Sequence, residues 1–176
     1  MPKSEVGGRL KVLWAPWRAK YVSTFINEER KGCIFCEMLN NGKSDRENLI
    51  LYRGKHSFVV LNRFPYTSGH FMIVPYRHVP SFEDLSEDER MELMEVLSIS
   101  IKALRISYRP DGINVGMNLG RAAGAGIEEH MHIHVVPRWV GDTNFMGVIG
   151  EVRVISDSLD SSFEKLKKAF EEATAN

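Results

Sequence analysis

The sequence EEHMHIHVVPRW, at residues 128–139, determines how the predicted sheet is oriented. It carries three histidines at alternate positions, His130, His132 and His134. Apolar residues occupy the positions between and after them, namely Met131, Ile133 and Val135. Because successive side chains of a strand point to opposite faces, a strand here places the imidazoles on one face and the apolar residues in the core. We therefore expect the histidine side of this strand to be exposed or to line a cleft.

The segments around this strand predict an antiparallel sheet. Runs rich in Val, Ile, Leu and aromatic residues predict further strands at 48–54, 56–62, 70–75, 113–118 and 151–156. The first two are separated by Arg53-Gly54-Lys55 and predict a hairpin. The strand and helix order is not that of a Rossmann fold, and the sequence contains neither a dinucleotide fingerprint nor a Walker loop.

Helices are predicted to pack on this sheet. Ser86 and Glu89 form a capping-box pattern, apolar residues follow at helical spacing, and Pro-Asp-Gly at 110–112 ends this long helix. An amphipathic helix is predicted at 161–173, and a short helix or knuckle follows Cys33. An antiparallel sheet of about five strands with helices on one face is an α+β fold.

The length of 176 residues is sufficient for one domain with its own core. We divide it into three parts. An aromatic N-terminal extension at 1–32 carries Trp14 and Trp17 and is expected to pack on the body. The central part spans 33–145, and a C-terminal strand and helix span 146–176.

Charge and composition argue against several functions. Lys+Arg and Asp+Glu both number 23, so the formal net charge is zero and gives no support to nonspecific binding of nucleic acid or an anionic membrane. The sequence contains no apolar run long enough for a membrane span and no signal-peptide pattern. Cys33 and Cys36 are the only cysteines, which is not a secreted disulfide framework, and we expect a cytoplasmic location.

Three interpretations of the histidine strand remain open from the residues alone. A solvated polar face is the least favoured, because three histidines alternate strictly beside a glycine-rich loop. Histidines at i and i+2 also suit a catalytic metal, although Glu128 and Glu129 complete no familiar ligand set. Alternatively, one histidine is a nucleophile, because neutral imidazole attacks phosphorus near pH 7 and the loop amides can bind phosphate oxygens.

Several motifs together resemble the histidine triad (HIT) family of nucleotidyl hydrolases and transferases. HMHIHVV resembles the family signature, in which histidines alternate with apolar residues. Residues 56–79 resemble its nucleoside-binding strands, and residues 112–130 resemble its phosphate-binding segment. The flanking sequences LWAPWR at 13–18 and VVPRWVGDTNF at 135–145 resemble the bacterial diadenosine tetraphosphate phosphorylase branch of that family.

The resemblance implies specific roles for the site residues. His132 would attack the α-phosphorus and carry a nucleotidyl group, and His134 would hydrogen-bond a phosphate oxygen or the leaving group. Asn118 would support the phosphate site and Asn62 would bind ribose hydroxyls, although both also suit turns that end strands. Backbone amides of Gly124, Ala125, Gly126 and Ile127 would contact phosphates, although these glycines could also serve only a tight turn. Many relatives have Ser or Gln near 126 or 127, where this chain has Gly and Ile.

The Cys33-x-x-Cys36 pair supplies two of four ligands for a zinc knuckle, and alone it also suits buried cysteines or a redox pair. The family resemblance implies that His78 and His130 complete a structural zinc site, with one ion per chain. His70 and His56 are expected to be structural or to support the site indirectly.

Aromatic and arginine side chains offer further candidates. Trp14, Trp17 and Trp139 either close the edge of the core or line the pocket beside a base, where aromatic faces stack well. Arg18, Arg121 and Arg138 are either surface residues or phosphate contacts.

The favoured interpretation is a nucleotidyltransferase that cleaves diadenosine tetraphosphate by phosphorolysis to ATP and ADP. Its expected ligands are adenine nucleotides, dinucleoside polyphosphates and inorganic phosphate, and the resemblance implies a homodimer. One alternative is a hydrolase of dinucleoside polyphosphates or nucleoside phosphoramidates, in which water is the acceptor. Another is a nucleotide-binding sensor without significant turnover.

Overall fold

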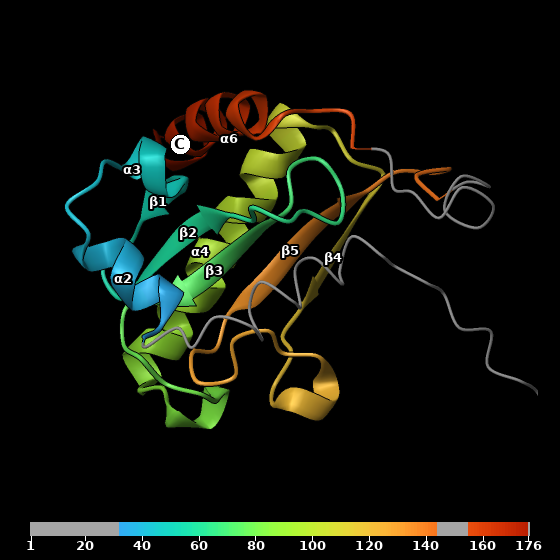
Figure 1. Cartoon of the computed structure of the whole chain (residues 1–176). Helices are drawn as coiled ribbons and strands as arrows, with labels where there is room; N and C mark the ends of the chain where they lie inside the picture. The colour runs from blue at the N-terminus through green and yellow to red at the C-terminus, as the bar shows by residue number, and fades with distance from the viewer. Residues whose placement is uncertain (1–31, 144–154, 176) are drawn as a thin grey trace, which may run out of the picture.

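A computed structural model of the chain describes residues 32–143 and 155–175 (Figure 1). Five strands form one antiparallel sheet in the order β1-β2-β3-β5-β4. The strands are β1 Ile50–Arg53, β2 Ser57–Leu61, β3 Phe71–Pro75, β4 Gly112–Gly116 and β5 Ile133–Arg138. The predicted α+β fold, the hairpin and five of the six strands are therefore confirmed. The sixth predicted strand and the N-terminal extension, with Trp14, Trp17 and Arg18, lie almost wholly outside the described residues.

Two long helices cover one face of the sheet. The predicted capping box is present at the start of α4 (Glu87–Ser107), where the Ser86 hydroxyl accepts from the Glu89 amide. The C-terminal helix α6 (Leu159–Ala175) packs against α4 and β1. In Figure 1 α4 passes behind the strands, and α6 lies along the top of the view, next to β1. The ring of Phe170 on α6 meets that of Phe71 on β3, so burial of aromatic side chains holds this helix on the body.

The strand register separates the two faces of the sheet. One row, on what we call the histidine face, runs across four strands through Val60, Met72, His134 and Gly116. The adjacent row, on the helix face, runs through Leu61, Phe71, Val135 and Val115. Leu61, Phe71 and Val135 are buried in the core, as the alternation in the sequence predicts.

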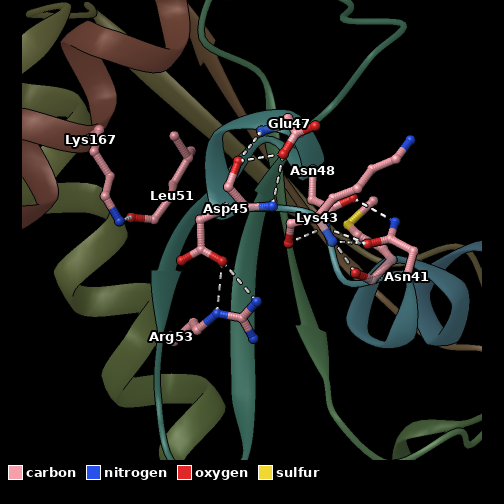
Figure 2. Close-up of polar contacts among 10 residues, drawn as sticks. Asn41, Lys43, Asp45, Glu47, Asn48, Leu51, Arg53 and Lys167 are labelled. Carbon is pink, nitrogen blue, oxygen red and sulfur yellow. Dashed lines mark hydrogen bonds and ion pairs between the residues drawn. The ribbon is translucent and has the colours of Figure 1, made fainter.

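Two short helices precede the sheet. Helix α2 (Ile34–Asn40) begins directly after Cys33 and buries Phe35. Helix α3 (Asp45–Asn48) was not predicted, although Ser44 and Glu47 form a complete capping box. Figure 2 shows how α3 joins its surroundings: Asp45 accepts from the Arg53 guanidinium on β1, and the buried Asn48 amide donates to the Asn41 side chain. Asn48 also donates to the Met38 carbonyl, so a satisfied buried amide ties the end of α2 to the sheet.

Candidate active site and metal centre

The histidine segment lies where β5 begins, rather than wholly within a strand. β5 starts at Ile133, so His130 and His132 lie in the irregular chain just before it. Both side chains are buried, at 0% and 6% exposed, and the Phe35 ring of α2 lies against each of them. The expectation of an exposed row is therefore wrong for these two, because α2 covers them. Only His134 is partly open to solvent.

A backbone hydrogen bond defines the protonation of His132. Its Nδ1 atom lies 3.0 Å from the His130 carbonyl oxygen, which can only accept, so we infer that the proton is on Nδ1. The lone pair is then on Nε2. Burial lowers the pKa of His132 below its ordinary value, which favours the neutral ring. A neutral imidazole with an unprotonated Nε2 is the form that a nucleophile requires.

His134 has the opposite tautomer to His132, which follows from its contact with His70. The Tyr66 amide donates to His70 Nδ1 at 3.1 Å, so His70 carries its proton on Nε2. His70 Nε2 lies 3.0 Å from His134 Nδ1 and donates to it. His134 therefore carries its proton on Nε2 and is a donor at that atom. The ring centroids of His132 and His134 are 4.9 Å apart, so a nucleophilic nitrogen and a donor lie side by side.

His70 contributes more to the site than its position in the sequence suggests. It is completely buried, and the Tyr66 ring lies 4.5 Å from its centroid. The Asn62 amide nitrogen lies 3.4 Å from both of its ring nitrogens, and Asn62 Oδ1 accepts from the Phe64 amide. Asn62 is thus placed beside the histidines. In the sequence, only the turn residues Ser68 and Gly69, before the predicted strand at 70–75, indicated a special position for His70.

The glycine-rich loop starts and ends beside the histidines. Gly116, the last residue of β4, pairs directly with His134, and the chain then returns to His130. The loop contains the short 3-10 helix η2 (Arg121–Ala123), after which Gly124 adopts a left-handed conformation with φ 87°. The Gly124 amide donates within the loop to the Arg121 carbonyl. Gly126 is exposed and Ile127 packs against the core, while Asn118 is half-buried.

The structure assigns other contacts to three candidate phosphate or base ligands. Arg121 extends into solvent, and its ion-pair partner is Glu128 at 4.0 Å. Arg138 is bidentate with Asp142, at 2.5 and 2.8 Å, and also donates to Asn114. The Trp139 ring meets the Tyr108 ring edge-on, at the C-terminal end of α4. Arg138 therefore closes the turn after β5, and Trp139 packs against an aromatic neighbour.

Four side chains that could bind a metal ion converge beside the triad: Cys33, Cys36, His78 and His130. Their ligand atoms all lie within 4.8 Å of one another. His130 Nδ1 lies 3.2 Å from Cys33 Sγ and 3.8 Å from Cys36 Sγ, and His78 Nδ1 lies 3.5 Å from Cys36 Sγ. Separations of roughly 3.3–3.8 Å are expected between ligands around a tetrahedral zinc ion, so this set fits the metal.

The protonation of this cluster also fits a cation. His130 Nε2 donates to the Pro75 carbonyl at 2.9 Å, which leaves the Nδ1 lone pair directed at the cysteines. Burial raises the pKa of the Cys33 thiol and lowers the pKa of His130, so both groups are neutral without a positive charge between them. A bound cation would displace the thiol proton and compensate for its burial.

Comparison with known proteins identifies a matching family model and similar proteins. The HIT domain model matches residues 43–140. The AP-4-A phosphorylase of Mycobacterium tuberculosis is 41% identical over 157 residues, which cover 86% of this chain and 80% of that protein. An uncharacterised HIT-like protein of Saccharolobus solfataricus is 36% identical over 115 residues, 65% of this chain and 79% of that protein.

The fold also matches a solved structure. A crystal structure of a zinc-bound histidine triad family protein from Mycobacterium smegmatis superimposes with a TM-score of 0.67. The match covers 82% of this chain and 96% of that chain at 24% identity, so it supports the fold alone. No helix among the described residues combines the length and the apolar character that crossing a membrane requires.

Proposed function

The chain belongs to the HIT family, because the HIT domain model matches more than half of it, and on this basis we propose that it cleaves diadenosine tetraphosphate by phosphorolysis. The products are ATP and ADP. The AP-4-A phosphorylase similarity, at 41% identity over 86% of the chain, supports this substrate class. The arrangement of His132 and His134 supports transfer of a nucleotidyl group through a histidine.

In the first step His132 Nε2 attacks the α-phosphorus. A nitrogen–phosphorus bond forms while the bond from that phosphorus to the departing ATP oxygen breaks, and the oxygen keeps the electron pair. His134 stabilises this oxygen by donating a hydrogen bond from Nε2. His132 Nδ1 keeps its proton and donates it to the His130 carbonyl oxygen, 3.0 Å from the nitrogen, and this hydrogen bond stabilises the positive charge that develops on the ring.

In the second step inorganic phosphate is the acceptor. A phosphate oxygen forms a new bond to the α-phosphorus, the nitrogen–phosphorus bond breaks, and the electron pair returns to His132. ADP is released. We assign the phosphate contacts to the backbone amides of Gly126 and Ile127, because the Gly124 amide donates within the loop. Asn118 supports the same phosphates, and Asn62 binds the ribose hydroxyls.

The observation that carries the proposal is the pair of opposite tautomers at His132 and His134, one an acceptor and the other a donor at Nε2. The test is to incubate the protein with diadenosine tetraphosphate, with and without inorganic phosphate, and to identify the nucleotides by ion exchange. We expect ATP and ADP only when phosphate is present. Phosphate-independent formation of ATP and AMP would instead identify a hydrolase. Nucleotide binding without any product would identify a sensor.

The proposal includes one structural zinc ion per chain, bound by Cys33, Cys36, His78 and His130. The tight cluster of their ligand atoms supports this assignment. The ion supplies structural cross-linking, because four protein ligands leave no open position for a substrate. Its ligands come from α2, from the segment after β3 and from the histidine segment, so it holds three parts of the chain together. Two thiolate ligands suit a reducing, cytoplasmic location.

The proposal also includes a homodimer formed through β4. Among the described strands β4 pairs only with β5, so its outer backbone groups are available to another strand. Val115 continues the buried helix-face row but is 44% exposed, and Met117 beyond it is 38% exposed. A second copy related by a two-fold axis pairs edge to edge and covers these apolar side chains.

A further inference from the structure

The turn that precedes β3 is held by contacts from the C-terminal part of the chain. This turn spans Tyr66–His70 and carries the imidazole that donates to His134. Within it, the His70 amide donates to the Thr67 carbonyl, and the Thr67 hydroxyl donates to the Pro137 carbonyl of β5. The Thr67 hydroxyl thus ties the turn to β5, and the Asn62 amide, which donates to the His70 carbonyl, ties it to the end of β2.

Tyr108 supports the other side of the turn. Its ring lies against Gly69, where an added Cβ atom would be only 2.8 Å from the nearest ring carbon. Gly69 also has φ +81°, which a side chain rarely tolerates. The position therefore requires glycine for two reasons. Gly69, which precedes His70, is therefore in contact with the ring of Tyr108 at the end of α4.

Asp157 holds both Tyr108 and the turn. The Tyr108 hydroxyl donates to Asp157 Oδ2 at 2.9 Å, and its oxygen lies 3.0 Å from the buried hydroxyl of Ser162. Lys165 donates to both carboxylate oxygens, at 3.0 and 2.8 Å. The Asp157 backbone amide in turn donates to the Ser68 hydroxyl at 3.1 Å. One residue is thus bonded through its side chain to Tyr108 and through its backbone to the turn.

We propose that Tyr108 and Asp157 are positioning residues, which hold the Tyr66–His70 turn so that His70 orients His134 for nucleotidyl transfer. This inference rests on the proposed function. The two residues touch no reacting atom. Asp157 acts on His70 through its bond to Ser68, and Tyr108 acts on His70 through its contact with Gly69. Because reactions of bound groups are sensitive to displacements of about 1 Å, a loosened turn lowers the rate of the chemical step by up to roughly a hundredfold.

The test compares two matched tyrosine variants. Tyr108→Leu removes the ring from Gly69 and the hydroxyl from Asp157, whereas Tyr108→Phe removes only the hydroxyl. The control is Tyr52→Leu, because Tyr52 is also half-buried and stacks on Phe170 of α6 at 5.8 Å, but lies on β1. Steady-state kinetics give kcat and KM for diadenosine tetraphosphate. Nitrogen-15 NMR of the histidine rings gives their tautomers without any need for turnover.

We expect Tyr108→Leu to lower kcat by roughly ten- to a hundredfold with little change in KM, and Tyr108→Phe to have a smaller effect in the same direction. The His134 ring signals should change from a single tautomer to a mixture in Tyr108→Leu. Tyr52→Leu should keep kcat and the ring signals while losing thermal stability. Unchanged kcat and ring signals in Tyr108→Leu, or equal losses in both leucine variants, would overturn the inference.

The two proposals fail in distinguishable ways. If the wild-type protein has no turnover, the proposed function fails, but the ring signals of His70 and His134 still report whether Tyr108 positions them. If Tyr108→Leu does not fold, Tyr108→Phe and Asp157→Ala provide the same comparison by NMR. Loss of the single His134 tautomer in these variants supports the inference, and its retention in both rejects it.

Discussion

At the scale of single residues, the site depends on which nitrogen of each imidazole carries the proton. His130, His132 and His134 have the same side chain and follow one another at alternate positions, yet their partners differ. A backbone carbonyl accepts from His130, another accepts from His132, and a ring nitrogen of His134 accepts from His70. In the proposed function the three histidines are therefore a metal ligand, a nucleophile and a hydrogen-bond donor, in that order.

The role of His132 leads to the first prediction. His132→Ala removes the atom that is proposed to form the covalent intermediate, so turnover of diadenosine tetraphosphate should fall by at least about a thousandfold while nucleotide binding stays measurable. The matched control is His56→Ala, because His56 lies at the β1–β2 turn and its backbone amide bonds Glu92 of α4. Mass spectrometry of wild-type protein quenched during turnover should detect a nucleotidylated His132. Near-normal turnover of His132→Ala would contradict the assignment.

A second prediction concerns Glu89, which forms an ion pair with Arg77 beside the proposed metal ligand His78. The hydrogen bonds from Arg77 lower the pKa of Glu89 from 4.5 to about 2. A carboxyl whose pKa is lower in the folded state stabilises the protein above its ordinary pKa, and this contribution is lost as the pH falls through the folded value. Wild type should therefore be more stable than Glu89→Gln at pH 7.

The measurement is urea unfolding of both proteins from pH 7 to pH 2. The difference in the free energy of unfolding between them should be constant above pH 5 and should shrink as the pH falls from 4.5 towards 2. A difference that does not change with pH would show that the Glu89 carboxylate contributes no charge-dependent stability.

At the scale of elements, the short helix α2 determines how the site is closed. It is only seven residues long, so its own backbone hydrogen bonds cannot stabilise it in isolation. Two kinds of contact hold it in place: Phe35 packs against His130 and His132, and Asn48 binds the Met38 carbonyl near its end. The cysteines at its start add the metal ligands of the proposed zinc site.

Removal of the metal gives the third prediction. Elemental analysis should find about one zinc per chain, and Cys36→Ser should lose it. Chelation should lower the thermal midpoint, because an ion that binds only the folded state stabilises it in proportion to the logarithm of its concentration over Kd. Lys43→Ala, in the exposed turn after α2, is the control and should keep both zinc and the midpoint. Metal-free protein with full stability would reject the site.

Elements with a strong local signal could be predicted from the sequence. Helix α4 has both a capping box and apolar residues at helical spacing, and it begins where expected. Helix α3 has the same capping pattern but only four residues, so no periodicity marked it. The burial of His130 and His132 could not be predicted, because it depends on α2, whose position is set by tertiary contacts. For the same reason the contact between His70 and His134, 64 residues apart, left no local pattern.

At the scale of the whole molecule, the sheet separates the hydrophobic core from the proposed active site. The helix face buries the core under α4 and α6 (Figure 1), and the histidine face carries the proposed active site and metal centre. The edge strand β4 contributes to both faces. Gly116 pairs with His134 on the histidine face, and Val115 lies on the helix face, where it is exposed. A partner at this edge would therefore lie close to the catalytic histidines.

The fourth prediction concerns assembly. Val115→Arg places a charge in the proposed dimer interface and should shift the sedimentation of the protein from dimer to monomer at micromolar concentration. Val140→Arg is the matched control, since Val140 is 93% exposed in the turn after β5, and it should remain dimeric. A wild-type protein that sediments as a monomer, or a Val115→Arg variant that remains a dimer, would reject the interface.

The hydrogen bond from His132 to the backbone of residue 130 has an evolutionary consequence. Every amino acid has a carbonyl group, so replacement of the His130 side chain does not remove the acceptor that orients the nucleophile. The side chain at this position is therefore free to gain or lose a metal-binding role without loss of that acceptor.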